Sequence, residues 1–195
     1  IINPAKVMDF NHANELRRYL VQVIQRFRNE KKKGKIIPYE ESALLDESNI
    51  VSLSGGNLGG KGRGLAFINT LIYHYEFEKY LPNINIRSPK TSVIGTDEFE
   101  YFLERNNLPE RVLKEKDYEL IKHRFLSGTL SEGLLKKLRK LLQLISKPIA
   151  IRSSGLFEDS LLQPFAGIFE TYILPNSHPD IDVRLRQATD AIKLV

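Results

Sequence analysis

The sequence predicts a mixed α/β (α+β) fold in which short strands alternate with amphipathic helices. The apolar run Ile50–Leu53 leads into a glycine-rich segment and then into a helical pattern. The stretch Pro148–Leu174 has the pattern of a strand, a polar loop and a second strand, and apolar residues at three- and four-residue spacing predict helices around these strands. At 195 residues the chain is long enough to bury a core, as one large domain or two closely joined lobes.

Composition excludes several classes of protein. No apolar run approaches the ~20 residues that a bilayer span needs, and Ile1–Pro4 does not begin a signal peptide. The chain has no cysteine, which excludes disulfides and thiolate metal sites and fits a reducing compartment, so we expect a cytoplasmic protein without a membrane partner. Because the first residue is not Met, we expect a piece of a longer protein.

The charge balance raises the question of a polyanionic partner. There are 29 Lys and Arg against 24 Asp and Glu, for a net charge of +5, and part of the excess lies in the basic run at residues 31–35. A run of this kind is more often a solvated helix end than a nucleic-acid patch. The loops do not interleave basic and aromatic residues as a stacking platform would, so we do not expect nucleic acid as the partner. Small phosphorylated ligands stay open.

The first predicted element is an amphipathic helix around residues 12–30. Its apolar residues recur at helical spacing: Leu16, Tyr19, Leu20, Val23, Ile24 and Phe27. The basic run after it suits a helix C-terminus, where cations oppose the negative end of the helix dipole. Ile36–Asn49 has the mixed composition of a connection. We therefore predict an N-terminal helical extension over residues 1–49 and a second domain over residues 50–195.

The glycine segment Ser54–Gly64 is the first candidate ligand site. It lies between the predicted strand Ile50–Leu53 and a helix predicted from Leu65 to Tyr75. Glycines let backbone N–H groups approach an anion, a helix N-terminus adds partial positive charge, and Lys61 supplies a full charge. We therefore interpret the segment as a phosphate-binding loop in preference to a flexible hinge with a solvated Lys61.

Two common phosphate-binding motifs are excluded for this segment. From Gly55 to Lys61 it fits the start of the Walker pattern, but Gly62 stands where a Ser or Thr should help to hold magnesium, which excludes a P-loop NTPase. The dinucleotide pattern G-x-G-x-x-G also fails, because Leu65 and Phe67 stand at its last position.

The middle of the chain predicts one strand and two helical regions. The strand is expected over Thr91–Gly95, and Thr96 is a good N-cap for a helix whose first turn holds acidic residues. The side chains of this helix that are predicted to point inward are Phe99, Phe102 and Leu103. Residues 108–127 are predicted to be helical and less regular, and Gly128 breaks them.

Two further helices are predicted in the C-terminal half. Ser131 opens a helix with one leucine-rich face and one basic, solvated face, and Pro148 stops it. A final helix starts near Pro179, after a turn at Pro175-Asn176. No spacing among the histidines is typical of a metal-ligand set or a nucleophile–base pair, so no catalytic or metal-binding role is assigned to His12, His74, His123 and His178.

The polar loop after Ile149–Ile151 carries the second candidate cation. Arg152 stands at the strand end, where its planar guanidinium could hold phosphate oxygens with two parallel hydrogen bonds. A salt bridge to Glu158 or Asp159 is the alternative, and the two roles are compatible. The acidic pair is interpreted as orienting or structural, in preference to an acid/base pair or magnesium ligands.

Together the two motifs resemble the nucleotide-binding N-terminal region of the pyruvate phosphate dikinase and phosphoenolpyruvate synthase family, which in turn resembles an ATP-grasp fold. The resemblance covers about residues 50–195. The motifs that carry it are, in order, Leu58-Gly59-Gly60-Lys61-Gly62, Ile149-Ala150-Ile151-Arg152-Ser153-Ser154, Glu158-Asp159, Phe165-Ala166-Gly167 and Glu170-Thr171-Tyr172. The resemblance implies the first lobe of an ATP-grasp-like nucleotide-binding domain, with the second lobe expected after Val195.

The resemblance also implies roles for individual residues. Lys61 and Arg152 would contact the ATP phosphates as the catalytic cations. Gly167 and Thr171 would line the nucleotide site through backbone and hydroxyl groups, and the glycine segment would contribute Gly60 and Gly62. Magnesium is expected to bind an acid and a glutamine of the second lobe, so no metal ligand is assigned within residues 1–195.

The implied activity of the intact protein is an ATP-dependent phosphotransferase of the kinase or dikinase type. Its partners would be ATP, a downstream phosphohistidine domain and a downstream acceptor-binding domain, and this piece alone would be inactive. One alternative is a nucleotide-binding or regulatory module that has lost catalysis. Another is a nucleic-acid or protein-interaction domain that owes its affinity to the basic helices around residues 17–35 and 136–140.

Overall fold

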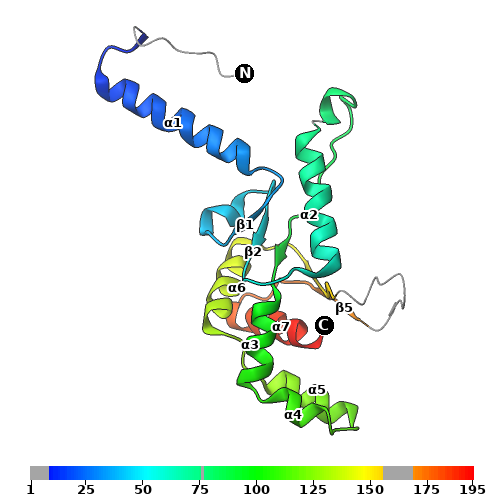
Figure 1. Ribbon diagram of the computed structural model, residues 1–195. Coiled ribbons are helices and arrows are strands. Elements are labelled where there is room, and N and C mark those ends of the chain that lie inside the picture. Colours follow the sequence, from blue (N-terminus) through cyan, green and yellow to red (C-terminus); the bar gives the residue numbers. More distant parts are fainter. Residues whose placement is uncertain (1–8, 76, 156–168) are drawn as a thin grey trace. The chain divides into compact units, whose positions relative to one another are not determined.

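A computed structural model describes residues 9–75, 77–155 and 169–195 of the chain (Figure 1). The chain divides into two compact units, Ile1–Lys33 and Gly34–Val195. Strands and helices are both present, which confirms the predicted α/β (α+β) class. None of the helices in the described residues is both long and apolar enough to cross a bilayer.

The first unit contains one long helix, α1, at Ala13–Lys32. This confirms the amphipathic helix predicted around residues 12–30. Lys31 and Lys32 lie in its last turn, as the dipole argument requires, and the Lys31 ammonium lies 4.6 Å from the centre of the Phe27 ring. The basic run is therefore a helix end.

A three-stranded parallel sheet begins the second unit. Its strands are β1 at Ile36–Pro38, β2 at Ile50–Ser52 and β3 at Ser92–Val93, in the order β1-β2-β3. The strands predicted at residues 50–53 and 91–95 are thus present. The segment interpreted as a connection holds β1 and the 3-10 helix η2 at Glu41–Leu45, so it packs with the second unit.

The helix after the glycine segment begins earlier than predicted. Helix α2 spans Gly59–His74, and the prediction that it starts at Leu65 was wrong. Glycine lowers intrinsic helix propensity, but the amides of Gly60 and Gly62 donate to the carbonyl and hydroxyl oxygens of Ser154, and these tertiary hydrogen bonds decide the boundary. A short 3-10 helix, η3 at Phe77–Lys79, follows α2.

Helix α3 at Thr96–Arg105 packs Phe102 and Leu103 inward as predicted, but not Phe99. Phe102 is 4% exposed as expected, but Phe99 is 57% exposed, so its inward prediction was wrong. Glu98 takes the inward position because its carboxylate binds the start of a later helix. The predicted N-cap was also wrong, since Gly95 occupies that position and Thr96 is the first helical residue.

The region predicted to be helical and less regular forms two short helices. They are α4 at Leu108–Val112 and α5 at Tyr118–Ser127, and Gly128 ends the second as expected. Asp117 caps α5 by accepting hydrogen bonds from the N–H groups of Glu119 and Leu120.

The C-terminal half follows the predicted order of elements. Helix α6 at Glu132–Leu144 has Ser131 as its N-cap, strands β4 at Ile149–Arg152 and β5 at Thr171–Leu174 form an antiparallel pair, and α7 covers Ile181–Leu194. The basic face of α6 is not simply solvated. Lys137 donates a hydrogen bond to the Leu53 carbonyl at 2.6 Å, which ties α6 to the end of β2.

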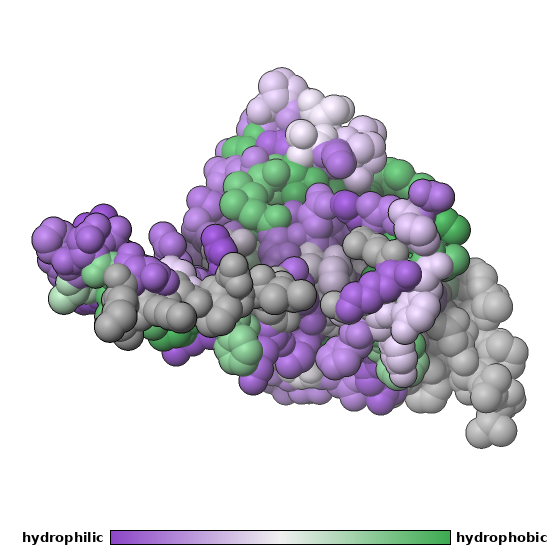
Figure 2. All heavy atoms as spheres, turned by 90° about the horizontal axis from the view of Figure 1, so that it is seen from above, coloured by the Kyte–Doolittle hydropathy of each residue, from purple (hydrophilic) through white to green (hydrophobic). Residues whose placement is uncertain are grey.

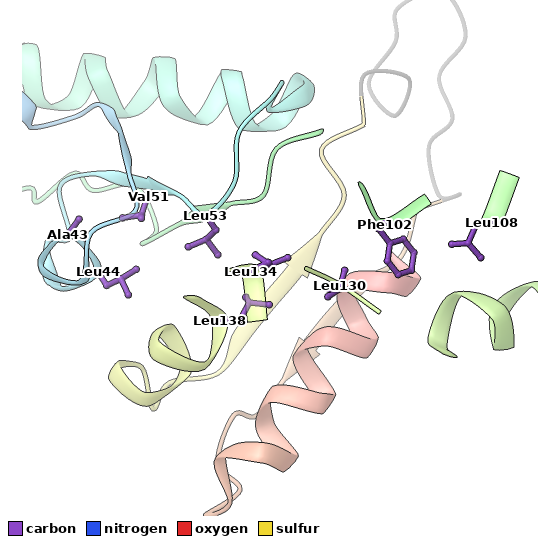
Figure 3. Packing of buried hydrophobic residues seen from close by; sticks show 9 residues of the cluster. All are labelled: Ala43, Leu44, Val51, Leu53, Phe102, Leu108, Leu130, Leu134 and Leu138. Carbon is purple, nitrogen blue, oxygen red and sulfur yellow. The ribbon is translucent and has the colours of Figure 1, made fainter. Parts of the chain in front are cut away.

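The core of the second unit joins β2, η2, α3 and α6. Figure 3 shows leucines from η2, from α6 and from the residue that follows β2 pointing toward one another. The cluster consists of Ala43, Leu44, Val51, Leu53, Phe102, Leu108, Leu130, Leu134 and Leu138. On the face shown in Figure 2, hydrophilic residues predominate and hydrophobic ones form smaller patches between them. This core holds β2 and α3 in place, and the glycine segment leaves from the end of β2.

Candidate functional site

The first half of the glycine segment is fixed against the start of α3. The Ser54 hydroxyl accepts a hydrogen bond from the Gly95 N–H at 2.8 Å, and Thr96 Oγ1 accepts one from the Asn57 N–H at 2.9 Å. The backbones are so close that a Cβ on Gly95 would lie 2.0 Å from the Gly55 carbonyl oxygen. Thr96 therefore anchors the segment instead of capping its own helix.

Gly59, the first residue of α2, must be glycine. Its φ is +69°, and a Cβ there would lie 1.5 Å from the carbonyl oxygen of Ser154. Its N–H donates to Asn57 Oδ1 at 3.1 Å. The helix start is thus pressed against the loop that follows β4 (Figure 1).

Ser154 joins this loop to the first turn of α2 through three hydrogen bonds. Its carbonyl oxygen accepts from the Gly60 N–H at 3.0 Å, and its hydroxyl accepts from the Gly62 N–H at 2.8 Å. The same hydroxyl donates to the carbonyl oxygen of Leu58 at 2.5 Å. The two glycine amides proposed to approach a ligand are therefore already bonded within the chain.

These contacts bring together the segments that carry the two candidate cations. Lys61 lies between the two glycines that bind Ser154, and Arg152 ends β4 two residues before Ser154. Lys61 is half-buried and Arg152 is exposed. Two positive side chains far apart in sequence thus extend from neighbouring backbone, which suits a ligand with several negative charges.

Thr171 faces Arg152 across the β4–β5 pair. The two residues are register partners, so their side chains lie on the same face of this two-stranded sheet, and Thr171 is exposed. The structure thus places Thr171 next to Arg152. Gly167, Glu158 and Asp159, to which the sequence assigned roles, lie outside the described residues.

Gly60 and Gly62 differ in what surrounds them. A Cβ on Gly62 would lie 3.1 Å from Leu58 Cβ and 3.3 Å from Ser154 Oγ, so the residue packs in the clamp formed by Ser154. A Cβ on Gly60 would meet no atom of the described residues within 4 Å. Internal packing among these residues therefore explains a glycine at position 62 but not at position 60.

Sequence reasoning missed the connecting residues of this site. Ser154 was noted as a neighbour of Arg152 and Asn57 as part of the glycine segment, without roles. Tyr172 was also given none, yet its hydroxyl donates to Glu170 Oε2 at 2.5 Å, and this hydrogen bond raises the pKa of Tyr172 to about 12. Its phenol therefore stays protonated near neutral pH.

The described residues do not form an acidic metal centre. No group of three or more His, Cys, Asp or Glu among them is placed to hold a metal ion. His12 precedes α1, His74 ends α2, His123 lies on α5 and His178 precedes α7. The interpretation that magnesium ligands belong to a following lobe stays a prediction.

Comparison with known families identifies the domain. Residues 56–188 match the family model for the AMP/ATP-binding domain of pyruvate phosphate dikinase. The chain belongs to this family. No curated protein and no solved structure gives a significant match to the chain.

The family match confirms the resemblance seen in the sequence and shows that the chain carries an AMP/ATP-binding domain. The matched range runs from the glycine segment to α7 and contains Lys61, Arg152, Ser154 and Thr171. The chain therefore carries the AMP/ATP-binding domain of a family of kinase and dikinase type, and ATP is the nucleotide to test at the contact between α2 and β4.

Proposed function

We propose that this chain binds the phosphates of ATP between Lys61 and Arg152. The observation that carries the proposal is the pair of hydrogen bonds from the Gly60 and Gly62 amides to Ser154, which brings the two cation-bearing segments together. One positive charge from each segment would neutralise oxygens of a single polyphosphate. Positioning and charge stabilisation of this kind supply most of the catalysis in phosphoryl transfer.

The neighbouring residues fit this arrangement. Among the described residues no neighbouring segment lies within 4 Å of a Cβ on Gly60, which leaves room for a ligand at the first turn of α2. We infer that Thr171, on the same face as Arg152, directs its hydroxyl to the nucleotide. Gly60, Gly62 and Gly167 remain proposed contacts, the last of them outside the described residues. Because the amides of Gly60 and Gly62 bind Ser154, their contribution would be close approach of the ligand instead of direct donation.

We further propose that the domain is the first lobe of an ATP-grasp-like site in a phosphotransferase related to phosphoenolpyruvate synthase. In the intact protein a phosphoryl group would pass to a histidine of a downstream domain and from there to an acceptor. Magnesium, when bound, would neutralise phosphate charge. Its ligands would lie outside the described residues, which hold no suitable acidic cluster. The cytoplasmic location likewise stays a prediction.

The test replaces each cation in the full-length protein. We expect Lys61→Ala and Arg152→Ala each to lower kcat/KM for ATP-dependent phosphorylation about 100-fold or more. Each substitution removes a positive charge that would stabilise the negative charge developing on the phosphate oxygens. Thermal unfolding should change little. Lys136→Ala, which removes an exposed cation on α6, is the matched control and should keep full activity.

The same experiment separates the remaining alternatives. Normal phosphorylation in either variant would overturn the assignment of the site. If the wild-type protein binds ATP by calorimetry but transfers no phosphoryl group, the domain is a nucleotide-binding module without catalysis. Binding of short DNA or RNA in a salt-dependent gel shift, without ATP binding, would favour the nucleic-acid alternative.

A further inference from the structure

We propose that Ser154 is the positioning residue of this site: it holds the Lys61 turn and the Arg152 strand at the separation that one ATP molecule requires. The inference rests on the proposed ATP-binding function and goes beyond it, because it assigns a role to a side chain that need not touch the nucleotide. The functional consequence of Ser154 would be transmitted through Lys61 and Arg152.

Ser154 forms its hydrogen bonds over a long distance in sequence. Its hydroxyl bonds to residues 92 and 96 positions away, Gly62 and Leu58. These two residues flank Lys61, and Ser154 itself follows Arg152 by two positions. The Ser154 hydroxyl therefore fixes the backbone on both sides of Lys61 relative to β4, the strand that carries Arg152.

The Ser154 hydroxyl acts as a hydrogen-bond donor and as an acceptor at the same time. A serine hydroxyl is one donor with two acceptor positions, and here it donates to the Leu58 carbonyl while it accepts from the Gly62 N–H. Alanine would leave both backbone groups without these partners but would keep the bond from Gly60 to the carbonyl oxygen of residue 154. The substitution thus loosens the contact between the two segments without removing it.

The start of α2 packs closely against Ser154. The left-handed backbone of Gly59 and the absence of a Cβ allow the Ser154 carbonyl to lie against the helix start. The neighbouring Ser153 provides a contrast, because its hydroxyl accepts from the Gly155 N–H at 3.1 Å within its own loop. The two adjacent serines therefore differ in their hydrogen bonds: Ser153 bonds within its own loop, and Ser154 bonds to another segment.

A competing interpretation makes the opposite prediction. The Gly60 and Gly62 amides could themselves be the anion site, with Ser154 occupying them until ATP displaces it. Removal of the hydroxyl would then free the Gly62 N–H and strengthen ATP binding. If Ser154 is instead a positioning residue, the same change must weaken binding, so the sign of the effect decides.

The experiment compares Ser154→Ala, Ser154→Thr and Ser153→Ala in the full-length protein. ATP affinity is measured by calorimetry, kcat/KM by phosphorylation, and folding by thermal unfolding. We expect Ser154→Ala to raise the Kd for ATP about 10-fold, because the two hydrogen bonds that hold the Lys61 turn against the Arg152 strand are lost and ATP must order the two segments when it binds. Ser154→Thr keeps the hydroxyl and should restore affinity to within about 3-fold of wild type, and Ser153→Ala should match the wild type.

A double-mutant cycle separates positioning from simple loss of structure. In a Lys61→Ala background, Ser154→Ala should change the Kd for ATP much less than it does alone, because the cation that Ser154 positions is gone. Equal effects in both backgrounds would overturn the inference, as would an unchanged or tighter Kd in Ser154→Ala. If Ser154→Ala does not fold, Ser154→Cys, with its weaker hydrogen bonds, takes its place under the same criteria.

The outcomes also distinguish the two proposals. A wild-type protein that does not bind ATP overturns both. Weaker but measurable ATP binding in Lys61→Ala and Arg152→Ala together with wild-type affinity in Ser154→Ala supports the proposed function and overturns the role of Ser154.

Discussion

Helices α2 and α6 both begin at residues that are bonded by polar side chains, but the sources of those side chains differ. Helix α6 starts at its own N-cap, Ser131, whose hydroxyl accepts from the Leu134 N–H at 3.1 Å. Helix α2 is preceded by Leu58, which has no polar side chain. Asn57 accepts from the Gly59 amide, but the amides of Gly60 and Gly62 donate to Ser154, in the loop that follows β4. The N-cap side chain of α6 is thus local, whereas two amides of α2 are bonded across the fold.

This difference separates a structural helix start from a functional one. At α6 the buried Glu98 accepts from the Ser131 N–H at 2.8 Å and from its hydroxyl at 2.7 Å, so these polar groups join α3 to α6 while Ser131 also caps α6. At α2 the bonding residue lies beside Arg152, and the bonded turn carries Lys61. Breaking the first contact should cost stability, whereas breaking the second should cost ligand binding as well.

Gly59→Ala should have the largest effect on the α2 side of this comparison. A methyl group 1.5 Å from the Ser154 carbonyl at φ +69° must force the helix start and the β4 loop apart. We expect destabilisation of about 3 kcal/mol or more and loss of measurable ATP binding, from overpacking and strain together. Urea unfolding and calorimetry of the full-length protein provide the measurements.

Gly133→Ala is the matched control for this variant. Gly133 lies in the first turn of α6, where a Cβ would come no closer than 3.9 Å to Ser131 Oγ. Its stability and ATP affinity should stay near wild type. If Gly59→Ala and Gly133→Ala have equal stability and equal ATP affinity, the start of α2 does not pack against Ser154.

Glu98→Ala should affect stability on the α6 side without affecting the ligand. The variant removes a buried carboxylate that accepts two hydrogen bonds from Ser131. We expect a loss of about 2–3 kcal/mol in the free energy of unfolding, because hydrogen bonds to charged groups are strong and the Ser131 N–H loses its partner. The Kd for ATP of the folded variant should change less than 2-fold.

Glu100→Ala, an exposed acid on the same helix, should leave both quantities unchanged. A large rise in the Kd for ATP in Glu98→Ala would mean that the α6 start also contributes to the site. The contrast drawn between the two helices would then be wrong.

The sequence alone predicts the local contacts of this fold better than the distant ones. Ser131 was identified as an N-cap because its partner lies three residues away, within one helical turn. The bonds of Ser154 span more than 90 positions, and no local pattern carries them. The start of α2 was misjudged for the same reason, since glycine propensity is a local property and the bonds that overrule it are not.

The prediction of side-chain orientation was wrong where a charged and an apolar residue compete for one buried position. Phe99 fits an inward-facing pattern, but its neighbour Glu98 is buried because Ser131 provides its hydrogen bonds. The cation pair was the more predictable feature, because the motifs around Lys61 and Arg152 resemble a known family. That the segments carrying these two residues lie side by side could be seen only in the structure, in which Ser154 joins them.

Gly64→Ala should give the smallest effect and the opposite sign. Gly64 lies inside α2, is exposed, and a Cβ there would meet no atom of the described residues within 4 Å. Alanine should stabilise the helix by about 0.5–1 kcal/mol, because glycine loses more conformational entropy on folding. Chemical unfolding measures this gain, and an unchanged Kd for ATP is expected, since Gly64 lies outside the contact between Ser154 and the helix start. A destabilised Gly64→Ala would instead indicate that α2 does not begin at Gly59 in solution and that the glycines up to position 64 belong to a loop.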